Sequence, residues 1–483
     1  MNSVTGRLLA LLCGPLLCVG LYCLLPSHYV DSAGHSVVFG AAARWTVGCI
    51  AWMAVWWLSE VVPLPATSLL PGMLFPLLGV ASLEATFAPY ADPLLFLFLG
   101  GFVIAIAIEK WGLHRRLAYS LLGVTGSAPH LVLAILSATA FISLWLSNTA
   151  TAVLMLPVAL SIASHESATN NLRKCLMLAV AYGSTIGGMG TLIGTPPNVF
   201  VASFLRSNYG VSLDFWKWLA IGLPMVAVML PFTFWLLTRM RFPLSTTLVL
   251  TLPDHGEQSL CWSHLPPAAR QTLCVFALAA VAWTTRALLV TVEIGGVRPF
   301  TNLSDAGIAV TAAVALFALP VPGLWRPVLE WDDTRGIPWG TLLLFGGGLS
   351  LAAAITANGV DKTLGAYLAG VPLLPKPVVI AAIAATVIFV SEIASNIATA
   401  AALTPLLAAA APAFGLTPVE AAVVTGLGAS SAYMLPVGTA PNALAYGSGF
   451  LTTRDMAGTG IVLNLVSIAL IVLVTCWVVP RVL

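Results

Sequence analysis

The sequence predicts an all-α polytopic membrane protein built from two inverted-topology repeats, and three observations lead to this prediction. Hydrophobic residues make up 59% of the 483 residues and charged residues only 8%, whereas soluble chains carry about 25% charged residues. Apolar stretches of the length that crosses a bilayer follow one another along the chain. A short polar motif containing helix-breaking residues occurs twice, once in each half.

Composition and motifs also exclude several functional classes. A net charge of +2 is too small to suggest a nucleic-acid partner. The eight cysteines form no CxxC pair with metal-binding spacing, so we interpret them as reduced packing residues without a metal cofactor. The chain has no HExxH, no GxSxG beside a histidine partner and no paired aspartates at a helix midpoint, so it is not expected to be an enzyme.

Apolar stretches predict about eleven transmembrane helices plus two re-entrant hairpins. The uninterrupted spans are expected at 8–25, 44–60, 64–81, 93–110, 218–238, 269–290, 303–320, 338–357 and 459–480. Short amphipathic stretches after Lys110 and from Asn358 to Ala369 are expected to lie along the interface. The first span is interpreted as a retained helix; a cleaved signal peptide is the alternative.

Four further segments are apolar but interrupted by polar residues, glycine or proline. They are the predicted hairpins 129–157 and 377–411 and the predicted broken helices 175–206 and 418–447. Such breaks inside a membrane are tolerated only where protein or a water-filled cavity satisfies the freed backbone groups. Duplicated broken segments of this kind are typical of transporters, which place a binding site near the bilayer midplane.

The breaks recur at nearly constant spacing. Asn148 and Asn396 are 248 positions apart, and Asn198 and Asn442 are 244 apart. A re-entrant hairpin at 129–157 places the basic clusters on one side of the membrane, as the positive-inside rule requires. We therefore expect a cytoplasmic N-terminus, a C-terminus outside, and these divisions: 1–43 first helix and outer loop, 44–242 first repeat, 243–268 linker and 269–483 second repeat.

The motifs combine two kinds of chemistry. Half-helix N-termini attract anions through unpaired N–H groups and the helix dipole. Hydroxyls, asparagine oxygens and freed carbonyls are hard ligands that suit a small cation such as Na⁺. Since the motifs contain no lysine or arginine, bound cations would neutralise an anionic substrate, and each would promote binding of the other.

Less specific interpretations stay open beside this one. Isolated serine, threonine or glycine residues in membrane helices usually just pack or form interhelical hydrogen bonds. Asn148 and Asn396 stand apart because both occur beside helix breakers at equivalent positions. Glu392 is an ionisable residue within a membrane segment. A proton site, a salt bridge at the hairpin end and interfacial exposure are its three interpretations.

Three motifs resemble those of the divalent anion/sodium symporter (DASS, INDY-type) family, and the resemblance covers essentially the whole chain. They are 143–151 (SLWLSNTAT), 194–198 (GTPPN) and 433–442 (YMLPVGTAPN). The resemblance implies a homodimeric elevator-type carrier with scaffold and transport domains. It also implies sodium-coupled symport of a di- or tricarboxylate such as succinate, malate, fumarate or citrate, with sulfate carried in one branch.

The same resemblance assigns site residues. The first sodium site would use Ser143, Ser147, Asn148 and Gly194, the second Ser391, Ala394, Asn396 and Gly438, and the substrate would meet Asn148, Thr149, Thr195, Asn396 and Thr439. Two departures lie in the second half-site. Ile397 stands where the family often has threonine, and Ala440 where a second proline is common. These leave substrate identity open.

The resulting expectation is a Na⁺-coupled di- or tricarboxylate importer in the lipid bilayer, located in the inner (plasma) membrane of a bacterium. The alternatives are a sodium-independent dicarboxylate exchanger, a carrier of sulfate or another oxyanion, and a channel. A purely structural membrane protein would not need two breaks at equivalent positions.

Overall fold

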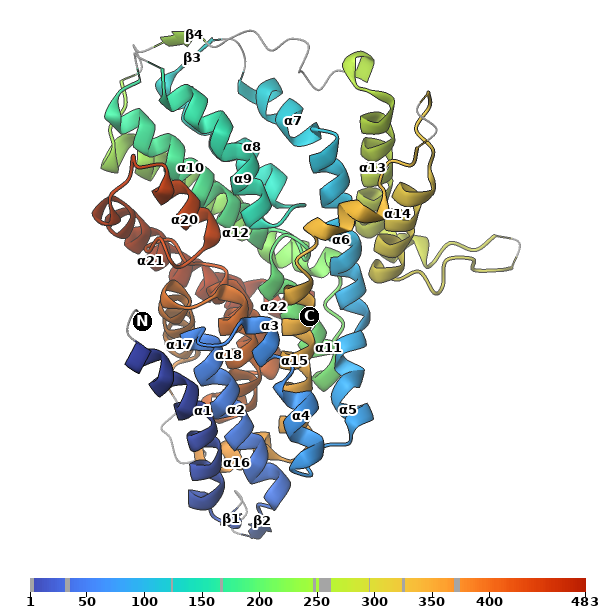
Figure 1. Ribbon diagram of the computed structural model, residues 1–483, viewed down its shortest axis with the longest axis vertical. Helices are drawn as coiled ribbons and strands as arrows, with labels where there is room; N and C mark the ends of the chain where they lie inside the picture. The colour runs from blue at the N-terminus through green and yellow to red at the C-terminus, as the bar shows by residue number, and fades with distance from the viewer. Residues whose placement is uncertain are drawn as a thin grey trace.

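The computed structural model is almost entirely helical (Figure 1). It describes residues 4–30, 35–122, 125–165, 168–245, 249–251, 262–294, 296–323, 326–368 and 374–483. Strand β1 (His28–Val30) pairs antiparallel with β2 (Ser36–Val38), and β3 (Thr125–Ser127) pairs antiparallel with β4 (Val249–Thr251). The second pair joins the start of the linker predicted at 243–268 to the segment before the first hairpin. Half of that linker, 246–248 and 252–261, lies outside the described residues.

The helices of the first half follow the apolar stretches of the sequence. They are α1 (Val4–Leu24), α2 (Ala41–Ser59), α3 (Leu64–Thr67), α4 (Leu70–Leu77), α5 (Leu83–Phe87), α6 (Pro93–Lys110), α7 (Leu113–Leu122), α8 (Ala128–Ser143), α9 (Asn148–Ala163), α10 (Asn170–Met189), α11 (Pro196–Tyr209) and α12 (Phe215–Trp235). The stretch predicted as one span at 64–81 is divided into α3 and α4. Helix α9 continues through Pro157 to Ala163, because an interior proline removes a single backbone donor and can kink a helix without ending it.

The helices of the second half follow in the same way. They are α13 (Pro267–Leu289), α14 (Asp305–Ala318), α15 (Trp339–Ala357), α16 (Val360–Leu368), α17 (Lys376–Ile393), α18 (Asn396–Ala410), α19 (Pro418–Ala429), α20 (Ala440–Gly447), α21 (Thr453–Trp477) and α22 (Val479–Val482). Both α9 and α18 begin at the motif asparagines. Short 3-10 turns connect several of these helices, as at Trp331–Gly336 and Ala411–Phe414.

Within the described residues, eight helical stretches are long and apolar enough to cross a membrane, and five shorter apolar helices accompany them. The chain is an integral membrane protein on this evidence. Helices α8 and α9 are among the shorter ones, with 16 residues each. Such a helix is about 24 Å long, less than the roughly 30 Å of bilayer hydrocarbon. Neither α8 nor α9 therefore crosses a bilayer on its own.

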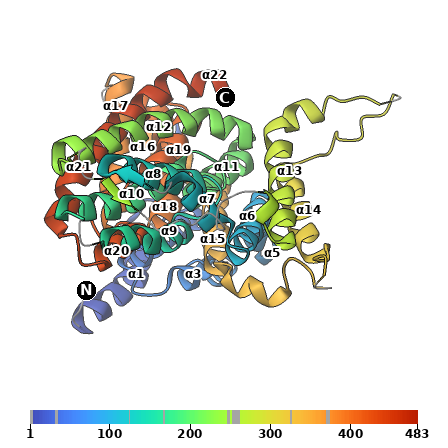
Figure 2. The ribbon, with the colours of Figure 1, turned by 90° about the horizontal axis from the view of Figure 1, so that it is seen from above.

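The interrupted helices lie inside the molecule. From Cys175 to Val199, apart from Pro196, every residue of α10, the loop after it and the start of α11 is buried. Helix α10 packs against α8, α9, α12 and α20, and α19 packs against α17, α18, α11 and α21. Seen from above in Figure 2, α13 and α14 stand with α6 at one side of the molecule. The polar motifs are thus surrounded by protein, as interrupted backbone in a membrane requires.

Candidate functional site

The first polar motif forms the turn between α8 and α9. Ser147 caps the N-terminus of α9, where its side chain accepts a hydrogen bond of 3.3 Å from the N–H of Ala150. Asn148 is the first residue of α9 and is buried. Ser395 and Asn396 occupy the same positions at the start of α18, although no side-chain cap bond forms there. Each motif asparagine therefore lies at the positive N-terminal end of its own helix.

The Ser143 hydroxyl lies between two oxygen atoms. Ser143 Oγ is 3.0 Å from Asn148 Oδ1 and 2.6 Å from the carbonyl oxygen of Ser184 in α10. A serine hydroxyl has a single proton and donates to one acceptor at a time. One proton therefore serves two acceptor oxygens, and the cluster has more oxygen acceptors than donors. A cation satisfies such a cluster, because each oxygen can be its ligand.

The second half repeats this arrangement. Ser391 Oγ is 2.8 Å from Asn396 Oδ1 and 2.8 Å from the carbonyl oxygen of Ala429 at the end of α19. Ser391 is fully buried, and so is Ser143. The two serine–asparagine pairs thus have the same spacing and the same third partner, a carbonyl at or near the end of a broken helix.

The loops that follow α10 and α19 are held by equivalent asparagines. Asn198 Nδ2 donates to the carbonyls of Gly188, at 3.1 Å, and Thr191, at 2.8 Å. Asn442 Nδ2 donates to the carbonyls of Ala432, at 3.5 Å, and Leu435, at 3.0 Å. The donor and both acceptor residues in the second half are each 244 positions after their counterparts in the first half. These asparagines belong to the sequence motifs, but their role in fixing the loops was not predicted.

Gly194 and Gly438 lie where oxygen atoms converge. A Cβ on Gly194 would be 2.6 Å from the carbonyl oxygen of Gly188 and 2.9 Å from that of Ser143. A Cβ on Gly438 would be 2.9 Å from Glu392 Oε2 and 3.2 Å from the Glu392 carbonyl oxygen. Only glycine allows these oxygens to approach so closely. In the first half, Ser143 contributes to the oxygen-lined cradle at Gly194 and contacts Asn148; in the second, the cradle at Gly438 is lined by Glu392, which adjoins Ser391 in the chain.

Several buried oxygens in this region have no hydrogen-bond partner among the described residues. They include the equivalent pairs Asn198 Oδ1 with Asn442 Oδ1, and Thr151 Oγ1 with Thr399 Oγ1. An unsatisfied buried polar atom is costly and marks an absent partner. Their occurrence in both halves supports a small hydrated or cationic ligand at each.

The two half-sites meet at the ends of the broken helices. Ser431 Oγ lies 3.4 Å from the sulfur of Met189, the last residue of α10. The rings of Tyr182 and Tyr433 stack edge to face with centroids 5.6 Å apart. The four predicted polar segments, of which the first and last are more than half the chain apart, are thus brought into one region of the fold.

The two hairpin turns differ in their exposure. Trp145 of the first turn is partly buried, with its ring centroid 4.9 Å from that of Phe276. Its counterpart in the second turn, Ile393, is 68% exposed. Likewise Ile193 is buried, whereas Val437 is 70% exposed. The second hairpin turn and the loop before α20 are therefore more exposed than their counterparts in the first half.

The predicted substrate residues occupy this same region. Thr149 is exposed, while Thr195 and Thr439 are buried at the N-termini of α11 and α20. Ala394 is buried beside Ser391. Thr439 accepts a hydrogen bond of 3.2 Å from the N–H of Asn442. No described lysine or arginine forms an ion pair with a motif residue.

Glu392 is almost completely buried, which excludes the exposed-carboxylate interpretation. It accepts hydrogen bonds from three consecutive backbone N–H groups, those of Tyr433, Met434 and Leu435, at 2.7, 2.8 and 3.0 Å. The amide of Asn464 in α21 donates to it at 2.8 Å. Sequence reasoning missed Asn464, although a lone asparagine in a long apolar helix is a signal that could have found it.

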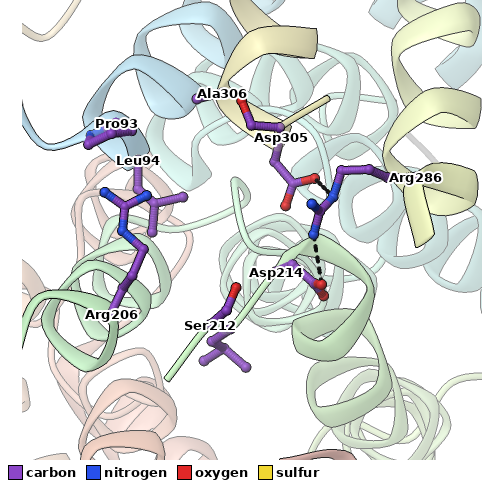
Figure 3. Close-up of a pocket in the computed structure, with 10 residues that line it drawn as sticks. Pro93, Leu94, Arg206, Ser212, Asp214, Arg286, Asp305 and Ala306 are labelled. Atoms are coloured by element: carbon purple, nitrogen blue, oxygen red, sulfur yellow. Dashed lines mark hydrogen bonds and ion pairs between the residues drawn. The ribbon is translucent and has the colours of Figure 1, made fainter. Parts of the chain in front are cut away.

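A small pocket lies elsewhere in the molecule (Figure 3). Its lining comes from α6, α11, the loop that precedes α12, α13 and the start of α14; it has a volume of about 90 Å³ and contains no residue of the polar motifs. Its charged side chains are all in ion pairs: Arg286 bridges Asp214, at 2.8 Å, and Asp305, at 2.7 Å, and Arg206 pairs with Asp92 at 3.1 Å. We interpret this pocket as a structural ion-pair region.

Buried interrupted helices, paired oxygen clusters and membrane-spanning helices define a membrane transporter. The sequence profile of the citrate transporter family (CitMHS) matches residues 54–428. The chain belongs to this family, which confirms the class that the motif resemblance predicted and its non-enzymatic nature.

Individual relatives and solved structures agree with this assignment. The chain is 36% identical to the sodium-dependent dicarboxylate transporter SdcS of Staphylococcus saprophyticus, covering 99% of this chain and 92% of the relative. It is 35% identical to SdcS of Staphylococcus aureus, with the same coverage. The fold resembles the YdaH transporter of Alcanivorax borkumensis, with a TM-score of 0.61, 14% identity and coverage of 98% and 97%. It also resembles MtrF of Neisseria gonorrhoeae, with a TM-score of 0.55, 13% identity and coverage of 98% and 94%.

Proposed function

We propose that this protein is a secondary active transporter that couples Na⁺ to the symport of a di- or tricarboxylate resembling succinate, malate or fumarate. The observation that carries the proposal is the repeated cluster of Ser143 with Asn148 and of Ser391 with Asn396. Each cluster has surplus oxygen acceptors and no described cationic side chain. The SdcS relatives, whose name specifies sodium and dicarboxylates, support the choice of ion and substrate.

The proposed chemistry divides between oxygens and helix ends. Ser143, Ser147, Asn148 and Gly194 form one Na⁺ site, and Ser391, Ala394, Asn396 and Gly438 form the other. The substrate carboxylates contact Asn148, Thr149, Thr195, Asn396 and Thr439, at the N-termini of α9, α11, α18 and α20. Helix N-termini favour negative charge. Since the motifs contain no lysine or arginine, bound Na⁺ supplies the charge that neutralises the carboxylates.

The proposal includes an alternating-access, elevator-type mechanism. In it, 44–242 and 269–483 are inverted repeats, α8–α9 and α17–α18 are re-entrant hairpins, and a transport domain moves against a scaffold. The protein acts as a homodimer in the inner membrane of a bacterium, with its N-terminus in the cytoplasm and its C-terminus outside. The equal offsets of the loop-fixing bonds of Asn198 and Asn442 support the repeat.

The test is uptake of radiolabelled succinate into proteoliposomes under an inward Na⁺ gradient or an equal K⁺ gradient. Uptake with Na⁺ alone is expected. Equal uptake in both would contradict Na⁺ coupling and favour the sodium-independent exchanger. Competition by unlabelled citrate and sulfate then separates the carboxylate carrier from an oxyanion carrier, for which Ile397 and Ala440 in the second half-site are the relevant departures.

A further inference from the structure

The two half-sites differ in charge at one pair of equivalent positions. Glu392, next to Ser391, occupies the position that Leu144, next to Ser143, has in the first half, 248 residues earlier. In the first half, the Thr191 hydroxyl donates to the Leu144 carbonyl and accepts from the N–H of Gly194 at 3.1 Å. The counterpart of Thr191 is Leu435, which has no hydroxyl. The neutral hydroxyl that holds the loop in the first half is therefore replaced by a carboxylate in the second.

The carboxylate holds a longer unwound segment. Helix α10 ends at Met189, whereas α19 ends at Ala429, four residues before the counterpart of Met189, which is Tyr433. The N–H groups of Tyr433, Met434 and Leu435 all donate to Glu392. Successive backbone N–H groups that converge in this way form an anion-binding nest. Glu392 thus satisfies donors that a continued helix would otherwise use.

The charge of Glu392 has no cationic partner. All four of its hydrogen bonds come from neutral donors, and none of the ion pairs among the described residues includes it. Three of these bonds end on Oε1 and one on Oε2. The less occupied Oε2 is the atom that a Cβ on Gly438 would approach to 2.9 Å. The free negative charge is therefore directed at the cradle of the second cation site.

We infer that Glu392 makes the two cation sites unequal: its charge strengthens the second site, which binds Na⁺ more tightly than the first and fills before it. This inference rests on the proposed function. A unit negative charge close to a bound cation, in surroundings of effective dielectric constant about 20, raises the affinity for the cation by roughly tenfold or more. Glu392 acts as a positioning and charge residue, not as a substrate contact.

The experiment measures Na⁺ binding without transport, as the Na⁺ dependence of thermal stability of the purified protein in detergent, with choline replacing Na⁺. The wild type is expected to show two phases separated by roughly tenfold or more in Na⁺ concentration. Ser143→Ala, which alters the first site, should keep the tight phase, and Ser391→Ala should lose it. Loss of the tight phase in Ser143→Ala and its retention in Ser391→Ala would overturn the inference.

Two variants separate charge from packing. Glu392→Gln should shift the tight phase roughly tenfold or more to higher Na⁺, and Glu392→Asp, which keeps the charge, should stay closer to wild type. If both shift equally, Glu392 is only a structural tie and the inference is wrong. Asn464→Ala removes one donor and keeps the charge, so its shift should be smaller than that of Glu392→Gln.

Glu420→Gln is the matched control, since Glu420 is buried in the same half but pairs with Lys376 at 2.5 Å. It should leave the Na⁺ phases unchanged. Succinate uptake by the same proteins tests the inference and the proposed function separately. Na⁺-dependent uptake with identical Na⁺ midpoints in wild type and Glu392→Gln would reject the inference alone. Absence of both Na⁺ stabilisation and Na⁺-dependent uptake in the wild type would reject the proposed function itself.

Discussion

Ser391 Oγ lies 2.8 Å from Asn396 Oδ1, and the corresponding atoms of Ser143 and Asn148 lie 3.0 Å apart. Each pair spans the turn between two helices, and each hydroxyl also contacts a carbonyl of the adjacent broken helix. The hydrogen bond alone would tie the turn together. The surplus of oxygen atoms around it is what makes the pair suitable for a cation.

Asn148→Ala is expected to abolish substrate-dependent uptake while the protein stays folded and inserted. The change removes the amide oxygen that the Ser143 hydroxyl approaches, and with it a proposed ligand of both Na⁺ and substrate. Radiolabelled succinate uptake in proteoliposomes is the measurement. Asn171→Ala, at a partly exposed asparagine outside the motifs that donates to the Pro243 carbonyl, is the control. Wild-type uptake by Asn148→Ala would remove this residue from the site.

Gly194→Ala and Gly438→Ala should each reduce uptake strongly. The added Cβ would come within 2.6 Å of the Gly188 carbonyl in one case and 2.9 Å of Glu392 Oε2 in the other. Since contacts below 3.0 Å force a shift of the oxygens themselves, the cradle should open. Gly447→Ala, where no atom lies within 4 Å of the added carbon, should transport normally. Equal uptake by all three variants would argue against cation sites at these glycines.

Loss of Arg286 should destabilise the protein more than loss of an exposed arginine. Arg286→Met leaves Asp214 and the buried Asp305 without their shared cation. Removing one member of a buried ion pair typically costs about 3–5 kcal/mol; the partial exposure of Arg286 and Asp214 places the effect toward the lower end. Thermal unfolding in detergent measures it.

The control for this prediction is Arg335→Met. Arg335 pairs with Asp332 at 3.0 Å, but both side chains are about four-fifths exposed. Exposed pairs contribute little to stability, so the unfolding temperature should hardly change. A larger loss in Arg335→Met than in Arg286→Met would contradict the interpretation of the Figure 3 pocket as a structural ion-pair region.

His114 in the amphipathic helix α7 should make stability depend on pH. Burial lowers its pKa to about 4, below the value of about 6.5 expected in the unfolded chain. The unfolded chain therefore binds a proton that the folded protein excludes. The stability that comes from keeping His114 neutral is complete above about pH 6.5, and it is lost progressively as the pH falls toward 4. Thermal unfolding between pH 7.5 and 5 should show a smaller change in His114→Gln than in wild type; equal slopes would contradict it.

The class, the positions of most helices and the residues of the polar motifs could be predicted from the sequence. Long apolar runs in a bilayer have to satisfy their own backbone groups, so they form helices, and their length is read directly from the sequence. Helix α6, predicted at 93–110, has these bounds in the structure. The division of 64–81 into α3 and α4 could not be predicted, because packing decides whether a proline or glycine interrupts a helix.

The sequence by itself determined that this protein is a helical membrane protein with a duplicated polar break, since composition and spacing are local properties of the chain. Only the tertiary structure decided which atoms meet at those breaks. Glu392 finds its partners on the loop at Tyr433 and on α21 at Asn464, 72 residues away. Hydrogen bonds of this kind depend on the direction and distance between packed helices, which no local pattern specifies. The sequence therefore shows that Glu392 replaces Leu144, but the contacts that the carboxylate makes appear only once the helices are folded together.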